Sequence, residues 1–339
     1  MNVGESILCI HLTLLSIANE PIFIGGTQRS GTSLLRSLID SNSEIYFPPA
    51  EMKFFVRFHH LLKTYEPLDK KGNLRRFLTD YGCYRKNIKR AGLLDSKEFF
   101  EVLSDNMPSW NRILSTIMQA LAAEESKVCW GEKSPGNEFF TENILKIYPK
   151  AKIICTIRDP RALIASSRRR YNRGFIKPMI RWKMSVRKII RDFQILSTDV
   201  FQIIFYEDMV IDLENTMKKV FDFLHIKPLQ PLNMLQLNSA KWGKGGTTSY
   251  QEKKSTREGI VWKDSLDAYK DEIGIFELKM IETFTRNERN LLSYIKKKSR
   301  GSSYFLEFSD RIKSSQYNVN YSPSVSRILN RFTDRPLLT

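Results

Sequence analysis

The stretch from residue 21 to residue 39 constrains the fold of this chain more than any other segment. Residues 21–26, PIFIGG, form an apolar run with the length and β-branched content of a buried strand. The next residues, 27–33, contain a glycine, and apolar side chains then recur at the spacing of a helix. A strand that passes through a glycine turn into a helix directs backbone N–H groups and the positive helix end at one spot. The segment therefore predicts an anion-binding loop at the end of a strand.

Runs with the pattern of strands alternate with helical patterns along the rest of the chain. The predicted strands are residues 127–130, 152–157 and 201–206, and the predicted helices are residues 137–148, 160–170 and 213–224. Such alternation is typical of parallel strands joined by helical crossovers. The predicted fold class is therefore α/β, with a parallel sheet flanked by helices.

The domain is expected to span residues 21–296, and residues 50–126, which are mostly helical in pattern, predict a helical cap inserted over the sheet. Residues 297–339 form a basic C-terminal tail. The apolar run at residues 7–18 is too short for a transmembrane helix and has no basic residues before it. We expect no transmembrane segment and a cytoplasmic protein, or a peripheral membrane or secretory-pathway protein if the N-terminus is truncated.

The charge of the chain predicts an anionic partner or substrate, because 54 lysine and arginine residues face 37 acidic residues, for a net charge of +17. The charge is scattered and accompanies no nucleic-acid-binding motif, so we expect no nucleic acid partner. The four cysteines form no CxxC pair, and the four histidines show no metal-ligand spacing, so we expect no metal. Cys129 and Cys155 lie in predicted strands and are expected to be free core thiols.

The loop at residues 26–33 resembles the phosphate-binding motif GxxxxGK[ST] in spacing but not in charge. Gly26 and Gly31 stand at the motif's glycine positions, and Ser33 takes the Ser/Thr place. Thr32 replaces the motif's lysine, and the positive charge lies at Arg29 inside the loop. The fold is therefore expected to be P-loop-NTPase-like, with anion-binding residues Arg29, Ser30, Gly31, Thr32 and Ser33.

A second anion-binding motif follows the predicted strand at residues 152–157. Arg158 comes directly after this strand, at the sheet edge where α/β folds bind ligands, and Ser166 lies eight residues later on the next helix. A guanidinium and a hydroxyl together suit a phosphate dianion. Arg170, one turn beyond Ser166, either joins them or belongs to a solvated basic helix end.

Both motifs resemble those of the sulfotransferases that use 3′-phosphoadenosine-5′-phosphosulfate, particularly the branch with an RSGT loop that contains the tyrosylprotein sulfotransferases and many bacterial enzymes. RSGT stands at residues 29–32, and RDPR stands at residues 158–161. The resemblance implies transfer of a sulfuryl group to a carbohydrate, tyrosyl or small-molecule hydroxyl. It also implies that Arg158 and Ser166 bind the 3′-phosphate of the donor. Tyr206 matches a position that contacts the nucleotide, the alternative being a buried tyrosine at a strand end.

Two further segments resemble the catalytic elements of that family. Residues 47–55, FPPAEMKFF, are similar to its Pro-Pro-Glu-Thr stretch, with one extra residue before the glutamate, so the resemblance makes Glu51 the candidate general base. Residues 130–135, WGEKSP, are similar to its Lys-[Thr/Asp/Ser]-Pro element, so Lys133 is expected to stabilise charge in the transition state together with Arg29. Glu132 is the second candidate base, although we expect it to point to solvent; His59 and His60 come third.

Residues 256–263, TREGIVWK, resemble the Arg-Lys-Gly and Trp-Lys elements of cytosolic sulfotransferases, with Glu258 in place of the lysine. The resemblance places Arg257 and Gly259 over the 3′-phosphate or the adenine; a mobile basic loop is the alternative.

The alternative function is a P-loop kinase or other phosphotransferase. It is disfavoured because Thr32 occupies the lysine position and no clear strand ends in an aspartate suited to Mg²⁺. Neither the acceptor nor the oligomeric state has a recognisable code in the sequence.

Overall fold

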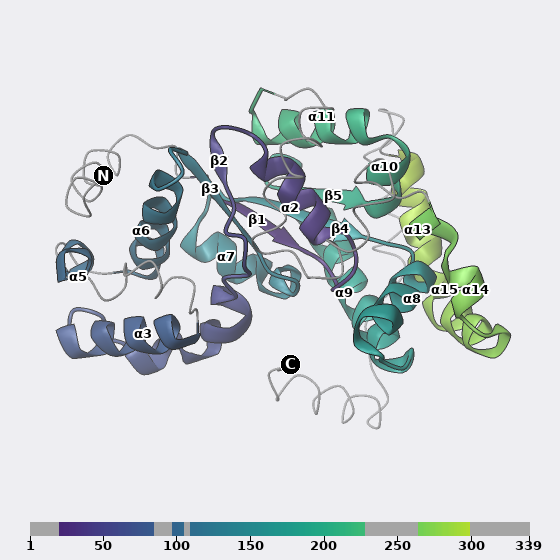
Figure 1. Cartoon of the computed structure of the whole chain (residues 1–339), viewed down its shortest axis with the longest axis horizontal. Helices are drawn as coiled ribbons and strands as arrows, with labels where there is room; N and C mark the ends of the chain where they lie inside the picture. The colour runs from purple at the N-terminus through teal and green to yellow at the C-terminus, as the bar shows by residue number, and fades with distance from the viewer. Residues whose placement is uncertain (1–19, 85–96, 105–108, 228–263, 299–339) are drawn as a thin grey trace, which may run out of the picture. The chain divides into compact units, whose positions relative to one another are not determined.

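The computed structural model describes residues 20–84, 97–104, 109–227 and 264–298 (Figure 1). Within these ranges five strands form a parallel sheet in the order β2-β3-β1-β4-β5. They are β1 (Ile22–Gly25), β2 (Ile45–Tyr46), β3 (Cys129–Lys133), β4 (Lys152–Ile157) and β5 (Phe201–Phe205). Parallel pairing brings the carboxyl ends of all five strands to one edge of the sheet. The predicted α/β fold with a parallel sheet is therefore confirmed.

Helices cover the sheet because its strands are apolar on both faces. On one face, Ile22 and Ile24 of β1 and Ile154 of β4 pack in a buried cluster with apolar residues of α2 (Thr32–Asp40) and α11 (Leu213–Leu224). Figure 1 shows α2 and α11 lying along this side of the sheet. Burial of this face sets the position of α2, whose first turn completes the glycine loop.

The opposite face of β1 is packed by aromatic rings. Phe23 is fully buried, and its ring lies 5.6 Å from that of Phe55, 5.9 Å from that of Trp130 and 5.7 Å from that of Tyr148. Two of these contacts are edge-to-face, a geometry that aromatic pairs favour. Because Phe55 immediately follows the segment that carries Glu51, this packing ties that segment to the centre of the sheet.

The segment predicted as a helical cap consists of short helices around a second aromatic cluster. They are η1 (Phe54–Phe58), η2 (His59–Tyr65), α3 (Lys71–Tyr84), α5 (Lys97–Ser104) and α6 (Trp110–Ala123). Phe54 and Phe58 each form edge-to-face pairs with Phe77 and Tyr81. Residues 113–122 of α6 are buried.

The remaining described helices follow β3. They are η4 (Asn137–Phe140), α7 (Thr141–Ile147), α8 (Pro160–Tyr171), α9 (Ile176–Ile195), α10 (Tyr206–Ile211), α13 (Asp264–Asp267), α14 (Tyr269–Glu272) and α15 (Ile275–Lys298). The chain divides into two units, Met1–Glu288 and Arg289–Thr339, and the site described below lies in the first. In the described ranges no helix combines the length and the apolar character needed to span a bilayer.

Several element boundaries differ from the predictions. The strand predicted at residues 127–130 begins at Cys129, where pairing with β2 starts, and continues to Lys133, because residues 131–133 pair with β1. The helix predicted at 137–148 is a 3-10 turn followed by α7, and Tyr206 begins α10 and does not end β5. β2, α9 and α15 were not predicted. β2 has only two residues, whereas α9 does carry a helical signal, since its buried residues Met179, Trp182, Val186 and Ile189 recur at helical spacing.

The two cysteines with described side chains carry free thiols, as predicted. Cys155 is fully buried in β4, whereas Cys129 at the start of β3 is half-buried. Burial raises the pKa of both thiols, so they are protonated at neutral pH and poor nucleophiles.

Candidate active site

The glycine loop joins β1 to α2 through left-handed backbone conformations. Gly31 has a φ of 98°, and a Cβ atom added there would come within 2.6 Å of the Tyr206 ring, so only glycine fits. Arg29 also has a positive φ, 73°, which is uncommon for a side chain of its kind. The hydroxyl of Ser30 shares a 2.7 Å hydrogen bond with that of Thr156 at the end of β4. The loop thus ends at the positive end of α2, as predicted.

A buried carboxylate that the sequence analysis missed fixes the start of this loop. One oxygen of Glu138 accepts hydrogen bonds from the backbone N–H groups of Gly26 and Gly136, both at 2.8 Å, and the other accepts from Ser185 of α9 at 2.7 Å. Glu138 is fully buried. The N–H of Gly26 is therefore already satisfied within the protein, as is that of Ser30, which donates to the carbonyl of Thr27 at 3.0 Å.

The structure brings the two predicted anion-binding motifs together. The Nε of Arg29 donates to the hydroxyl of Ser166 in α8 at 3.0 Å, and Nη1 of Arg158 donates to the carbonyl of Arg29 at 3.2 Å. The sequence analysis placed each motif at a strand end but did not foresee these contacts. They put two guanidinium groups and a hydroxyl, from loop and sheet edge, into one site.

The surroundings of Arg158 fit the recognition of a phosphate. Its side chain is 5% exposed and lies over the Tyr206 ring, with 4.1 Å from Cζ to the ring centroid. Nη2 donates to the Ser265 carbonyl at 2.7 Å, while the buried Nε has no hydrogen-bond partner among the described residues. Burial lowers the pKa of Arg158, so an anion placed beside it would recover a favourable interaction for the buried charge. Tyr206 is fixed in turn, because its hydroxyl shares a 2.8 Å hydrogen bond with that of Ser265.

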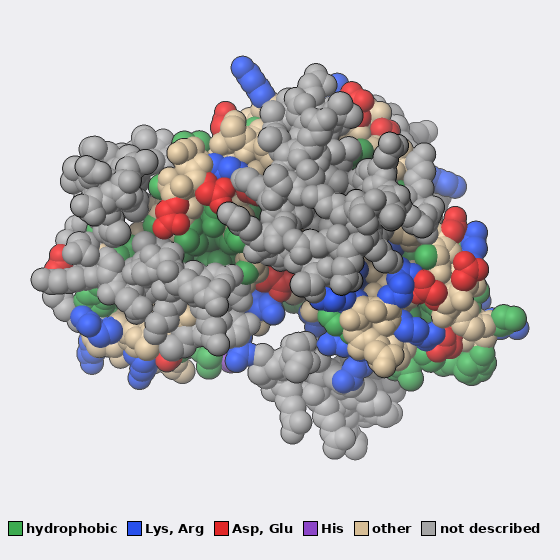
Figure 2. Space-filling model, in the orientation of Figure 1, with side chains coloured by type: hydrophobic (Ala, Val, Ile, Leu, Met, Phe, Trp, Pro, Cys, Tyr) green, Lys and Arg blue, Asp and Glu red, His purple; other side chains and the backbone are tan. Residues whose placement is uncertain are grey.

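The remaining residues predicted to bind the nucleotide are one exposed arginine and two residues outside the described ranges. Arg170 is exposed at the end of α8, where Figure 2 shows basic side chains gathered over α8 and α9. Its neighbours Arg168 and Arg169 pair with Glu277 and Glu272, respectively. Within reach of Arg29, the positive charge of Arg170 acts to lower the pKa of that guanidinium, after the larger effect of burial. Arg257 and Gly259 lie outside the described residues.

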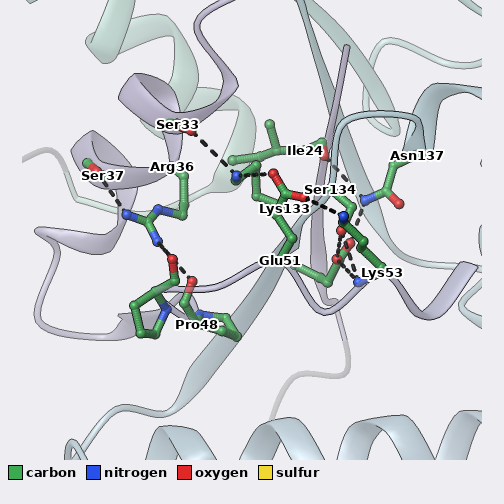
Figure 3. Close-up of polar contacts among 12 residues, drawn as sticks. Ile24, Ser33, Arg36, Ser37, Pro48, Glu51, Lys53, Lys133, Ser134 and Asn137 are labelled. Carbon is green, nitrogen blue, oxygen red and sulfur yellow. Dashed lines mark hydrogen bonds and ion pairs between the residues drawn. The ribbon is translucent and has the colours of Figure 1, made fainter. Parts of the chain in front are cut away.

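Two of the three predicted catalytic residues, Glu51 and Lys133, form an ion pair at the end of β3. Nζ of Lys133 lies 3.0 Å from Oε1 of Glu51 and 3.5 Å from the hydroxyl of Ser33, at the first turn of α2 (Figure 3). The other carboxylate oxygen of Glu51 lies 3.4 Å from Nζ of Lys53. Lys133 is 8% exposed, whereas the side chain of Glu51 is 27% exposed. Glu51 is therefore the member of the pair that a solute can reach.

The ionisation of this pair is set by burial and by neighbouring charge. Burial acts to raise the pKa of Glu51, but the ammonium groups of Lys133 and Lys53 outweigh it and hold the pKa below its usual range. Burial lowers the pKa of Lys133, against the opposing effect of Glu51. At neutral pH the carboxylate is ionised and can accept a proton.

The prediction that Glu132 points to solvent is wrong. Glu132 is 1% exposed, and its carboxylate accepts hydrogen bonds from the backbone N–H of Lys53, at 3.1 Å, and from the side chains of Ser134 and Asn137. Alternation along β3, which extends further than predicted, turns Glu132 to the face opposite Lys133. Burial raises the pKa of Glu132. Its oxygens are occupied by the protein's own donors, so we do not place it as the base.

Arg36 is a second residue that the sequence analysis missed. Its Nη1 donates to the carbonyls of Pro48 and Pro49 at 2.9 and 2.8 Å, and its Nη2 donates to the hydroxyl of Ser37 at 3.3 Å (Figure 3). The signal in the sequence is a single arginine inside the apolar helix pattern LLRSLI that follows the loop. Two of its partners are backbone carbonyls, which every residue type has, so the sequence carries no signal for these contacts.

A model described as the sulfotransferase family matches residues 21–231 of this chain. Protein-tyrosine sulfotransferase A of Caenorhabditis elegans is 24% identical over 212 residues, which cover 60% of this chain and 50% of that protein. A putative protein-tyrosine sulfotransferase of Caenorhabditis briggsae is 24% identical over 227 residues, 65% of this chain and 70% of that protein. The chain thus spans about half the length of the first of these relatives.

Two solved structures share the fold. The sulfotransferase domain of the olefin synthase from Synechococcus PCC 7002 superposes with a TM-score of 0.50 at 18% identity, covering 80% of this chain and 96% of that domain. The sulfotransferase domain from the curacin biosynthetic pathway gives a TM-score of 0.52 at 18% identity, covering 82% of this chain and 99% of that domain. The shared fold agrees with the P-loop-NTPase-like α/β fold that the glycine loop predicted.

Proposed function

Because the chain belongs to the sulfotransferase family, we propose that it transfers a sulfuryl group from 3′-phosphoadenosine-5′-phosphosulfate to the hydroxyl of an acceptor. The observation that carries the proposal is the meeting of the glycine loop, Arg158 and the Lys133–Glu51 pair at one edge of the sheet. The catalytic domain spans residues 21–296, with residues 297–339 as a basic tail.

The donor is held by the two anion-binding motifs. Arg158 and Ser166 take the 3′-phosphate, since a buried guanidinium and a hydroxyl satisfy its oxygens. Arg29, with the amides of residues 31–33 and the hydroxyls of Ser30, Thr32 and Ser33 at the start of α2, takes the 5′-phosphosulfate. Tyr206 contacts the nucleotide. Arg170, Arg257 and Gly259 complete the donor site, the last two from a segment that lies outside the described residues.

In the transfer step, Glu51 accepts the proton of the acceptor hydroxyl as the new O–S bond forms. The bond between sulfur and the bridging oxygen breaks, and its electron pair leaves on the 5′-phosphate of the nucleotide product. Lys133 and Arg29 stabilise the charge that develops on that oxygen. The ion pair suits both tasks, because it orients Lys133 toward the loop and keeps Glu51 ionised. General base catalysis of this kind contributes typically about 10²–10⁴ in rate.

The alternative of a P-loop kinase draws no support from the matched family, the relatives or the solved structures described above, all of which are sulfotransferases. The cation that approaches the loop here is Lys133 from β3, whereas Thr32 occupies the lysine place of a kinase loop. Among the described residues, no three His, Cys, Asp or Glu side chains are grouped as metal ligands.

The test is transfer of label from radiolabelled donor to three classes of acceptor: tyrosine-containing peptides, oligosaccharides and small phenols. Tyrosine peptides come first, because the two relatives are named for protein tyrosine. We expect labelled acceptor and the 3′-phosphorylated nucleotide to form in equal amounts. A protein that labels no class and binds no 3′-phosphorylated nucleotide would contradict the proposal.

A further inference from the structure

The turn that carries Glu51 is held by a charged side chain on each side of that residue. We propose that Arg36 and Glu132 are positioning residues that fix the Glu51 carboxylate against Lys133, Arg36 through the backbone before Glu51 and Glu132 through the backbone after it. The proposal rests on the proposed function only in calling Glu51 the base, since the contacts themselves are independent of the reaction.

Arg36 acts on the approach to Glu51. Its Nη1 donates to the carbonyls of Pro48 and Pro49, which lie three and two residues before Glu51 (Figure 3). Proline has no N–H group, so these two residues offer no backbone donor with which the turn could hold itself in place. The guanidinium projects from α2, the helix whose first turn belongs to the anion-binding loop. Arg36 therefore couples the position of the base to that of the donor site.

Glu132 acts on the backbone that leaves Glu51. Lys53 adopts a left-handed conformation with a φ of 54°, which costs a non-glycine residue free energy unless neighbouring groups enforce it. Its N–H donates to Oε1 of Glu132 at 3.1 Å and to the hydroxyl of Ser134 at 3.0 Å. Both acceptors are buried. Glu132 thus fixes the chain two residues after Glu51 and keeps the side chain of Glu51 turned to Lys133.

The second oxygen of Glu132 makes its conservative variant informative. It accepts from the amide nitrogen of Asn137, whose own amide oxygen is buried with no hydrogen-bond partner among the described residues. In Glu132→Gln, the carbonyl oxygen can still receive the Lys53 N–H. The new amide nitrogen can donate to Asn137 once that side-chain amide turns over, at the cost of the 3.3 Å hydrogen bond that the Asn137 nitrogen donates to the carbonyl of Ile24. Glu132→Gln therefore keeps the clamp, whereas Glu132→Ala removes it.

The experiment is hydrogen exchange of the backbone amides at residues 47–55 in the full chain, for Arg36→Met, Glu132→Ala and Glu132→Gln. Losing hydrogen bonds to a charged group should speed exchange in the first two variants on the order of tenfold to a hundredfold. Glu132→Gln should recover most of the protection. Arg112→Met is the matched control, because Arg112 donates to the carbonyl of Val102 at 2.9 Å within the cap. It should leave exchange at residues 47–55 unchanged.

Turnover supplies the second measurement. Arg36→Met and Glu132→Ala should lower kcat about tenfold or more, while the affinity for 3′-phosphoadenosine-5′-phosphate stays within about twofold. Should either variant fail to fold, Arg36→Lys, which can reach one carbonyl, and Glu132→Gln should still show graded exchange and graded kcat. Unchanged exchange at residues 47–55 in Arg36→Met and Glu132→Ala overturns the inference, whatever the activity. If exchange is faster in the two variants but the unsubstituted protein transfers no sulfuryl group, the proposed function is refuted and the inference about Arg36 and Glu132 stands.

Discussion

Replacement of Arg158 by alanine tests whether the site recognises a 3′-phosphate. In the structure the guanidinium spans the carbonyls of Arg29 and Ser265 and stacks on Tyr206, so the substitution removes two hydrogen bonds and one cation–π contact. The variant should therefore lose stability as well as affinity, and the assay must separate the two.

The expected size of the affinity change follows from the contacts that a phosphate would make. A hydrogen bond to a charged group contributes about 1.5–3 kcal/mol, which corresponds to a loss of roughly tenfold to a hundredfold in affinity for 3′-phosphoadenosine-5′-phosphate. A nucleotide with the same 5′-phosphate but no 3′-phosphate, 5′-adenylate, lacks the group that Arg158 contacts. Its affinity should change by no more than about twofold, since only general disturbance of the loop reaches it.

Titration calorimetry with both nucleotides measures this difference on one preparation. Arg161→Ala is the matched control, because Arg161 also stacks on a tyrosine, with 4.7 Å from its Cζ to the Tyr269 ring centroid, and pairs with Asp159 and Glu282. It should destabilise the protein without selective loss of the 3′-phosphorylated ligand. Equal losses for the two nucleotides in Arg158→Ala would refute the assignment and make Arg158 a support of the loop alone.

Three further predictions concern the donor and the base. 3′-Phosphoadenosine-5′-phosphate should raise the melting temperature more than ATP with Mg²⁺ in a thermal shift assay, and the reverse order would contradict a sulfotransferase site. Glu51→Gln should lower turnover by about 10²–10⁴ while donor affinity measured by calorimetry holds; near-normal turnover would move the base elsewhere. Because Lys133 and Lys53 hold the pKa of Glu51 below its usual range, the base stays ionised as the pH falls, and kcat should stay level from about pH 8 to about pH 5. A loss of kcat on acidification that begins near neutral pH would show that another group accepts the proton.

The fold could be predicted from the sequence because its signals are local. The strand and glycine loop at residues 21–33 and the strand before Arg158 each carry their pattern within a few residues. Parallel strands then place both motifs at one edge whatever the loops between them do. Arg29, Ser166 and Arg158 meet because β1 and β4 are neighbours in the sheet.

The contacts that support the site could not be predicted, because they are long-range and involve the backbone. Glu138 reaches Gly26 across 112 positions of the chain, and its sequence context is an ordinary helix start. The role of Glu132 depended on the last residues of β3, and ending that strand at Trp130 left Glu132 in a loop exposed to solvent. Because the predicted strand ended three residues too early, Glu132 was expected to be exposed when it is in fact buried.

The three hydrogen bonds of Glu138 order the start of the glycine loop when the protein folds, before a nucleotide binds. By holding Gly26, Gly136 and Ser185 together, the carboxylate shapes the start of the loop before any nucleotide arrives. The entropy lost in ordering that backbone then belongs to folding, and donor binding is relieved of it. Substitution of Ser185, which donates to the Glu138 oxygen that does not contact the loop, should consequently weaken nucleotide binding. Screens for loss of activity should therefore return substitutions at Ser185 of α9.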